Sequence, residues 1–214
     1  MTRKTIEREA RQGFIIKTAR QLFAEKGIEN TNMEDIAAAV DYTRRTLYAY
    51  FKSRDEICMQ VFIEDLTERW RLQREAMTAA KTGLDKIMIW GETFYRYAKE
   101  YPHSMKLQFY WDFRGIDRDR LDPEVFRAFE NINDELAEGL REIFRMGISD
   151  GSLRADLQID LCISQYLYSL RSILNRAVTP GYTFAAFDPD RYVRHFLELF
   201  ARGIRNSKET KNDN

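Results

Sequence analysis

The stretch TNMEDIAAAVDYTRRTLYAYFKSRDEI, residues 31–57, contains three helix starts in succession. Asn32 followed by Asp35 is an acidic variant of the capping box, and Thr43 can cap a second short helix. A full S-x-x-E capping box at residues 53–56 opens a third helix. Two short helices joined by a tight turn form a helix-turn-helix, whose second helix can lie in the major groove of DNA. The stretch therefore predicts a helix-turn-helix.

The second helix of this motif exposes cations, hydroxyls and small side chains: Thr43, Arg44, Arg45, Tyr48 and Ala49. Arg44 and Arg45 point about 100° apart, so one can reach a base edge while the other reaches a phosphate. Arginine can donate two hydrogen bonds to one guanine. The alternative is a pair of solvated surface arginines. Thr43 can also present the amide end of the helix to a phosphate.

Cations also flank the start of the third helix, where the helix dipole alone favours anions. Lys52 and Arg54 lie on either side of the cap Ser53, and a nearby DNA phosphate would make this placement favourable. The hydroxyl groups of Tyr42 and Tyr48 either donate to phosphates or leave their rings to pack. The complete predicted DNA-binding set is Thr31, Tyr42, Thr43, Arg44, Arg45, Tyr48, Lys52 and Arg54.

Charge is distributed unevenly along the 214 residues, although the net charge is zero. Residues 1–54 contain eleven Lys and Arg against seven Asp and Glu, a net charge of +4 that suggests a polyanionic partner for this segment. The start of the chain is charged, and no apolar run approaches the ~20 residues that span a bilayer. We expect a soluble, cytoplasmic protein without a membrane partner.

The cysteines Cys58 and Cys162 lie far apart and form no C-x-x-C motif. They are expected to be small buried apolar residues in a reducing compartment, and a disulfide or redox switch is the alternative.

Nearly every apolar pattern in the chain has the helical period, and only four prolines and ten glycines interrupt it. The expected fold is all-α, with about nine helices. We expect a helix-turn-helix DNA-binding domain over residues 1–53, a larger helical ligand-binding and dimerisation domain over 54–206, and a disordered tail over 207–214. Besides the two short helices, the predicted helices cover residues 9–26, 54–80, 84–100, 104–113, 123–147, 157–178 and 189–205.

The larger domain is rich in aromatic side chains that combine apolar bodies with polar tips. Such residues suit a mostly apolar pocket with a few orienting groups, although aromatic residues at helical spacing also form ordinary core. Gly91 and Gly139 remove side-chain volume and are expected to leave a cavity. His103 is expected at the surface or at a helix start rather than at a ligand. The predicted ligand-binding residues are Trp90, Phe94, Tyr97, Phe109, Tyr110, Trp111 and Tyr166.

The chain resembles the TetR family of bacterial transcriptional regulators, strongly over residues 14–57 and in layout elsewhere. The matching elements are Ala19, Leu22-Phe23-Ala24-Glu25-Lys26-Gly27, Thr31, Asp35-Ile36-Ala37, Thr46-Leu47-Tyr48, Tyr50-Phe51 and Ser53-Arg54-Asp55-Glu56. The resemblance implies a helical homodimer whose first three helices bind DNA and whose remaining helices bind a ligand. It favours Tyr48 as a phosphate contact. It also implies that the last two helices pair across a two-fold axis, with Leu161, Gln165, Tyr168, Tyr192, His195, Phe196 and Leu199 as candidates.

Two positions depart from the family pattern. Asp41 stands in the turn where the family usually has glycine, and aspartate tolerates the left-handed conformation better than most residues. Arg45 stands where the family often has a small residue, so we expect this chain to read its own DNA sequence.

These observations predict a ligand-responsive DNA-binding transcriptional regulator, a repressor released from a palindromic operator by a small hydrophobic or aromatic ligand. The alternative is a helical protein-interaction module that does not bind DNA. An enzyme is not expected, because the chain has two histidines, no H-E-x-x-H, no cysteine cluster and no glycine-rich phosphate loop. No cofactor, metal site or catalytic residue is predicted.

Overall fold

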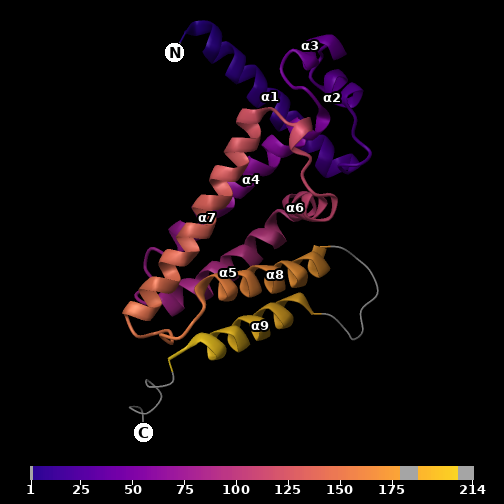
Figure 1. The fold of residues 1–214 in the computed structure, drawn as a ribbon. Coiled ribbons are helices and arrows are strands. Elements are labelled where there is room, and N and C mark those ends of the chain that lie inside the picture. The colour runs from indigo at the N-terminus through magenta and orange to yellow at the C-terminus, as the bar shows by residue number, and fades with distance from the viewer. Residues whose placement is uncertain (1, 179–187, 207–214) are drawn as a thin grey trace. The chain divides into compact units, whose positions relative to one another are not determined.

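The computed structural model describes residues 2–178 and 188–206, and within these ranges the chain forms nine α-helices and one short 3-10 helix (Figure 1). The proposed tail over 207–214 lies outside the described residues. The elements are α1 (Arg3–Lys26), α2 (Met33–Ala39), α3 (Arg44–Tyr48), α4 (Arg54–Ala76), α5 (Gly83–Glu100), α6 (Pro102–Arg114), η1 (Arg118–Arg120), α7 (Pro123–Ser149), α8 (Ile159–Val178) and α9 (Pro189–Ile204).

The predicted all-helical fold is confirmed, and the described residues contain only one isolated β-bridge, between Leu153 and Arg205. The largest difference from the sequence prediction is at the start of α1. This helix begins at Arg3, where the Thr2 hydroxyl accepts a hydrogen bond from the Thr5 amide at 3.3 Å, rather than near Glu9. Hydrophobic periodicity missed these turns because none of their side chains is buried.

The chain divides into two compact units, and the division falls inside three helices. Unit 1 comprises residues 1–67 and 107–132, and unit 2 comprises residues 68–106 and 133–214. The boundaries therefore lie within α4, α6 and α7. The boundary expected after residue 53 does not coincide with this division, because residues 107–132 group with the helix-turn-helix.

The core of unit 1 is built from the apolar faces of its helices. Ile15, Ile36 and Leu47 are fully buried, one from each of α1, α2 and α3. The turn between α2 and α3 places Asp41 at φ 57°, in the left-handed region, and the Tyr42 amide donates to the Ala37 carbonyl at 2.9 Å. The expectation that Asp41 would take this conformation in place of glycine is therefore confirmed.

An aromatic cluster fills the core of unit 2. Trp90 of α5 lies 5.6 Å from the ring of Tyr166 of α8, whose hydroxyl donates to the Ile87 carbonyl at 2.6 Å. The ring of Tyr166 also packs on Phe200 of α9 at 4.7 Å. Since Tyr166 is fully buried, this hydrogen bond offsets the cost of removing its hydroxyl from water.

The expectation that Gly91 and Gly139 leave a cavity was wrong. A Cβ atom added to Gly91 would lie 2.2 Å from the Tyr166 hydroxyl, and one added to Gly139 would lie 2.4 Å from the Trp70 ring. Each glycine admits a neighbouring aromatic ring into the space that its missing side chain would occupy. Close packing therefore accounts for both residues.

The start of α5 and the end of α7 approach with no side chain between them. A Cβ atom on Gly83 would lie 2.3 Å from the Gly147 Cα atom. The Gly83 amide donates to the Asp150 carboxylate at 2.8 Å, and the Leu84 amide donates to the Ser152 hydroxyl at 3.2 Å. These bonds satisfy amides that a helix start otherwise leaves without partners.

Both cysteines are free thiols, and Cys58 is buried as expected, whereas Cys162 is only half-buried. Burial raises the pKa of the Cys58 thiol. None of the described helices is both long enough and apolar enough to cross a bilayer.

Candidate DNA-binding interface

Helix α3 is held by one buried side chain and one cap, which leaves its other face exposed. The Thr43 hydroxyl accepts a hydrogen bond from the Thr46 amide at 3.1 Å, so the predicted cap is present. Leu47 is fully buried, whereas Arg44, Arg45 and Tyr48 on the other side are exposed. A five-residue helix with such a charged face is suited to contact a polyanion.

The two arginines of α3 differ in their surroundings. The Arg44 guanidinium lies 2.5 Å from the Glu34 carboxylate of α2 and 5.5 Å from the centre of the Tyr48 ring. Arg45 forms no ion pair with any residue in the described ranges. A phosphate or base would therefore compete with Glu34 for Arg44 but would meet an uncommitted guanidinium at Arg45.

Tyr42 packs against the end of the helix-turn-helix. Its ring stacks on Tyr50 with ring centres 6.3 Å apart and planes inclined by 21°. Of the two predicted roles for Tyr42, the structure shows packing. Tyr48 is 43% exposed, so its hydroxyl is accessible to a phosphate.

Lys52 is exposed but paired. Its ammonium group lies 2.9 Å from the Asp122 carboxylate, and this hydrogen bond raises the pKa of Lys52. Asp122 also accepts a hydrogen bond from the Glu124 amide at 2.9 Å, so it caps α7 as predicted. A Lys52 contact to DNA, which stays a prediction, would require this surface ion pair to open.

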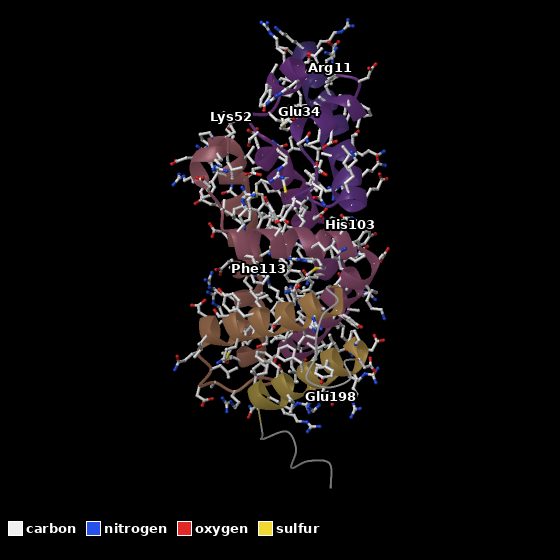
Figure 2. All side chains as sticks on the ribbon, turned by 90° about the vertical axis from the view of Figure 1, so that its right-hand side faces the viewer. Arg11, Glu34, Lys52, His103, Phe113 and Glu198 are labelled. Carbon is white, nitrogen blue, oxygen red and sulfur yellow. The ribbon has the colours of Figure 1, made fainter. Side chains whose placement is uncertain are left out.

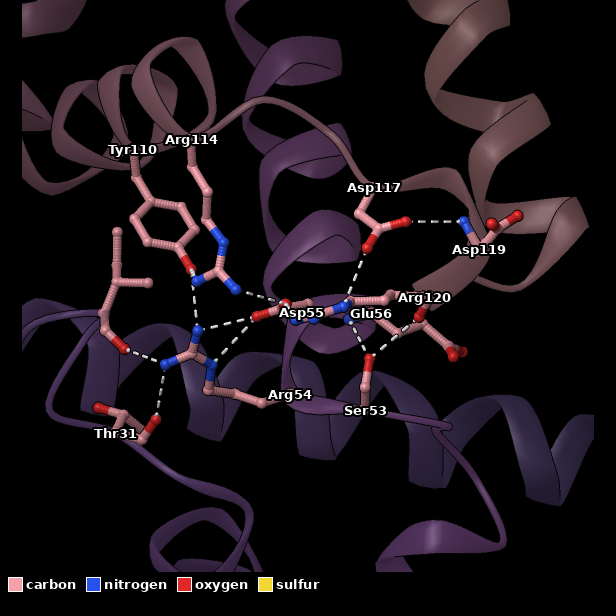
Figure 3. Close-up of polar contacts among 11 residues, drawn as sticks. Thr31, Ser53, Arg54, Asp55, Glu56, Tyr110, Arg114, Asp117, Asp119 and Arg120 are labelled. Carbon is pink, nitrogen blue, oxygen red and sulfur yellow. Dashed lines mark hydrogen bonds and ion pairs between the residues drawn. The ribbon is translucent and has the colours of Figure 1, made fainter.

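The side chains of Arg54 and Thr31, both predicted to contact DNA, are turned into unit 1 and bind protein groups, and their contact with DNA stays a prediction. The Arg54 side chain is 20% exposed and donates to the Ile28 carbonyl at 3.0 Å, to Asp55 at 2.8 Å and to the Tyr110 hydroxyl at 2.8 Å (Figure 3). Thr31 is 1% exposed, and its hydroxyl donates to the Gly27 carbonyl at 2.8 Å. Local sequence could not reveal these partners, because Tyr110 belongs to a distant segment.

The same region forms a polar network that attaches residues 107–132 to the start of α4, all within unit 1. The Asp55 carboxylate is 13% exposed and accepts hydrogen bonds from Arg54 and from Arg114, the latter at 3.3 Å (Figure 3). The Ser53 hydroxyl donates to the Arg120 carbonyl at 3.2 Å. Because Ser53 also caps α4 by accepting from the Glu56 amide at 3.1 Å, one side chain serves both contacts.

Sequence reasoning missed two cations that contact the end of α3. Arg8 donates to the Ala49 carbonyl at 3.2 Å, and Arg11 donates to the Tyr50 hydroxyl at 3.3 Å. The available signal was the helical spacing of the cations near the start of the chain, which hydrophobic patterning ignores.

The seven predicted ligand-binding residues are divided between the two units. In unit 2, Trp90, Phe94 and Tyr166 pack in the aromatic core, and Tyr97 lines a cavity of about 260 Å³ that also involves Leu72 and Arg96. In unit 1, Phe109 and Trp111 are buried, and the Tyr110 hydroxyl accepts a hydrogen bond from Arg54. The prediction that these residues bind a ligand stays a prediction.

The helix-turn-helix matches a known family. Residues 15–61 match the family model described as bacterial regulatory proteins, tetR family. The HTH-type transcriptional repressor KstR2 from Mycolicibacterium smegmatis is 23% identical over 203 residues, which are 94% of each chain. The fold is that of solved regulators, including the ketosteroid transcriptional regulator KstR2 of Mycobacterium tuberculosis (TM-score 0.65, 17% identity, 91% and 95% of the two chains). A TetR/AcrR family regulator from Thermobifida fusca YX-ER1 gives a TM-score of 0.68 at 20% identity, over 91% of this chain and 98% of that one.

The match covers the helices that form the exposed cationic face, and the relatives match along almost the whole chain. Residues 15–61 therefore form a DNA-binding domain of the TetR-family type, and the chain shares the fold of solved transcriptional regulators.

Proposed function

We propose that this protein is a homodimeric repressor that binds a palindromic operator through α3 and leaves it when a small hydrophobic ligand binds. The observation that supports DNA reading most directly is the exposed face of α3, where Arg44, Arg45 and Tyr48 project from a helix anchored by Leu47. Arginine side chains on such a helix can read guanine in the major groove and can also bind phosphates. Repression is in keeping with the curated relatives, which are described as repressors.

Exposed apolar side chains on α8 and α9 support a dimer. Leu161 and Tyr168 of α8 are 52% and 70% exposed, and Tyr192 and Leu199 of α9 are 42% and 52% exposed. The members of each pair are seven residues apart, so each helix presents its pair on one face. A second copy of the chain would remove these side chains from water, and two-fold symmetry would place two α3 helices on one palindrome.

The proposed effector is hydrophobic and carries at least one polar group. The Trp90 indole N–H and the Gln73 amide oxygen are buried in unit 2 and have no hydrogen-bond partner in the described part of the chain. A buried polar atom without a partner costs about 1–3 kcal/mol, and a ligand that supplied one would remove this cost. One structural relative is described as a ketosteroid regulator, and a ketosteroid combines an apolar body with a polar oxygen.

The polar network around Arg54 offers a route by which a ligand changes DNA binding. Helix α6 begins in unit 2 and ends in unit 1, whereas α7 begins in unit 1 and ends in unit 2. The parts of both helices that belong to unit 1 lie within residues 107–132. There, Tyr110 and Arg114 contact Arg54 and Asp55 at the start of α4. A ligand that favours one position of α6 would shift these partners and hence the helix-turn-helix, provided that it binds the two states with different affinity.

The test of DNA reading is selection of bound duplexes from a random-sequence library by the purified full-length protein. The expected result is a palindromic sequence, bound with an affinity that falls steeply as salt concentration rises. Recovery of no preferred sequence, or binding without salt dependence, would contradict operator reading by α3.

Release is tested on the selected duplex with a panel of hydrophobic compounds that includes ketosteroids and long-chain acyl compounds. At least one compound is expected to weaken binding of the selected duplex while leaving the protein folded and dimeric. If compounds bind the protein and none of them changes its affinity for the duplex, the ligand-release mechanism is wrong.

A further inference from the structure

Helix α1 continues well beyond the core that it supports. Its first residue is Arg3, whereas its first buried residue is Ile15, and every residue from 2 to 11 is exposed. In Figure 1 this indigo segment extends out from the remaining helices of unit 1. Burial does not stabilise residues 3–11 of this helix, so their sequence is free to serve another purpose.

One face of this extension is cationic. Lys4, Arg8 and Arg11 have the spacing i, i+4 and i+7, so they project within about 60° of one another. The same face continues to Ile15, which is fully buried in unit 1. The cationic face is therefore the one that turns toward the helix-turn-helix.

Contacts with neutral groups fix this face beside the end of α3. The Arg8 guanidinium donates to the Ala49 carbonyl at 3.2 Å and lies 5.3 Å from the centre of the Tyr50 ring. Arg11 donates to the Tyr50 hydroxyl at 3.3 Å. Arg11 and Glu34 both lie at the end of unit 1 that carries α2 and α3 (Figure 2).

The charge of this face is not neutralised by the protein. Glu7, which belongs to the same helix, is paired with Arg3 at 2.9 Å, and Lys4, Arg8 and Arg11 form no ion pair in the described ranges. Each guanidinium has five N–H donors, and the protein uses one donor of Arg8 and one of Arg11. The remaining donors and the Lys4 ammonium group are open to solvent.

We propose that residues 3–11 of α1 form a second DNA-contacting element, in which Lys4, Arg8 and Arg11 bind backbone phosphates beside the bases read by α3. The proposal rests on DNA binding by the helix-turn-helix. Phosphate contacts position a protein without reading sequence, so this element adds affinity and salt dependence at any sequence. Arg8 and Arg11 also position the end of α3, whereas Lys4 has no hydrogen bond or ion pair with any residue that the structure describes.

The test measures affinity for the library-selected duplex and for an unrelated duplex at a series of salt concentrations. The variants are Lys4→Ala and the triple variant Lys4→Ala/Arg8→Ala/Arg11→Ala. Each lost phosphate contact lowers the slope of log affinity against log salt by about 0.9, and a dimer loses it twice. We expect shallower slopes by about 2 for the single variant and by about 5 for the triple variant, on both duplexes.

Lys17→Ala is the matched control, because Lys17 is an exposed cation on the opposite face of the same helix. Its slope should equal that of the wild type. The double variant Arg8→Lys/Arg11→Lys keeps the charge but changes the contacts to Tyr50 and Ala49, and it should retain most of the slope. If the charge-conserving variant loses as much of the slope as the triple variant does, Arg8 and Arg11 act by positioning alone. That result would overturn their proposed phosphate contacts.

A Lys4→Ala slope equal to that of the wild type would overturn the proposed phosphate contact of the extension. Failure of the underlying function looks different, because the wild-type protein itself would then show no salt-dependent duplex binding.

Discussion

Asp41 carries the turn of the helix-turn-helix with a backbone that most L-residues avoid. Its φ of 57° costs a β-branched residue about 1–2 kcal/mol, whereas glycine takes it freely. We expect Asp41→Val to lower the free energy of unfolding by about 1–2 kcal/mol, and Asp41→Gly to stay within about 0.5 kcal/mol of the wild type. Urea unfolding followed by circular dichroism measures both. Equal stability of the valine and glycine variants would show that the turn is not strained.

Arg44 and Arg45 are neighbours on α3, but they should differ in what they contribute. We expect Arg44→Ala or Arg45→Ala, whichever residue reads a base, to relax one operator position by about 1–3 kcal/mol. The other variant should weaken all sequences alike, because a phosphate contact carries no sequence information. Repeating the library selection with each variant separates the two roles. Unchanged sequence preference and affinity in both variants would refute the assignment of α3 as the reading helix.

If Arg44 binds DNA as proposed, Glu34 would compete with the DNA for its guanidinium group. Since their charged groups lie 2.5 Å apart, Glu34→Gln should release a cation at the surface that faces the polyanion. We expect tighter binding to any duplex and a steeper salt slope, by about 0.9 for each new contact. Glu29→Gln is the control, because it removes the same charge from an exposed residue without an ion pair in the described ranges. Equal gains in both variants would point to a general charge effect rather than to Arg44.

At the scale of the helix, close packing explains glycines that composition alone cannot. Gly91 and Gly13 both lie within helices, where alanine normally stabilises by about 0.5–1 kcal/mol. A Cβ atom on Gly13 meets nothing within 4 Å, whereas one on Gly91 would lie 2.2 Å from the Tyr166 hydroxyl. We therefore expect Gly13→Ala to raise the melting temperature and Gly91→Ala to destabilise by about 1–3 kcal/mol. Calorimetry that finds both variants stabilised would mean that Tyr166 moves aside freely.

Local signals placed most of the helix starts, because a capping side chain lies within a few residues of the amide that it binds. Asn32, Thr43 and Asp122 cap α2, α3 and α7 as the sequence predicts. The start of α1 was missed, since an exposed charged helix has no apolar stripe. The role of Arg54 was also missed, because Tyr110 lies 56 residues away and reaches it only in the folded chain. The exposed face of α3 was predicted correctly, since a short helix with one buried residue leaves its other side exposed. This face carries Thr43, Arg44, Arg45 and Tyr48.

At the scale of the whole molecule, dimerisation should decide how tightly a palindrome is bound. Leu161→Glu/Tyr168→Glu would place carboxylates on the exposed face of α8, where each lost apolar anchor costs about 2 kcal/mol. We expect this variant to elute as a monomer in light-scattering chromatography and to lose affinity for the selected duplex. Phe113→Glu is the control, because Phe113 is 83% exposed but lies on α6. A dimer that survives in the α8 variant would place the interface elsewhere.

The grouping of residues 107–132 with the helix-turn-helix matters to anyone who would graft this DNA-reading module onto another regulator. A transplant of residues 1–53 alone would remove Arg120 from Ser53 and Asp122 from Lys52. A longer graft that stopped within α4 would still leave the guanidinium of Arg54 without the Tyr110 hydroxyl. The transferable module is therefore discontinuous in the gene, and a working chimera must carry both of its pieces.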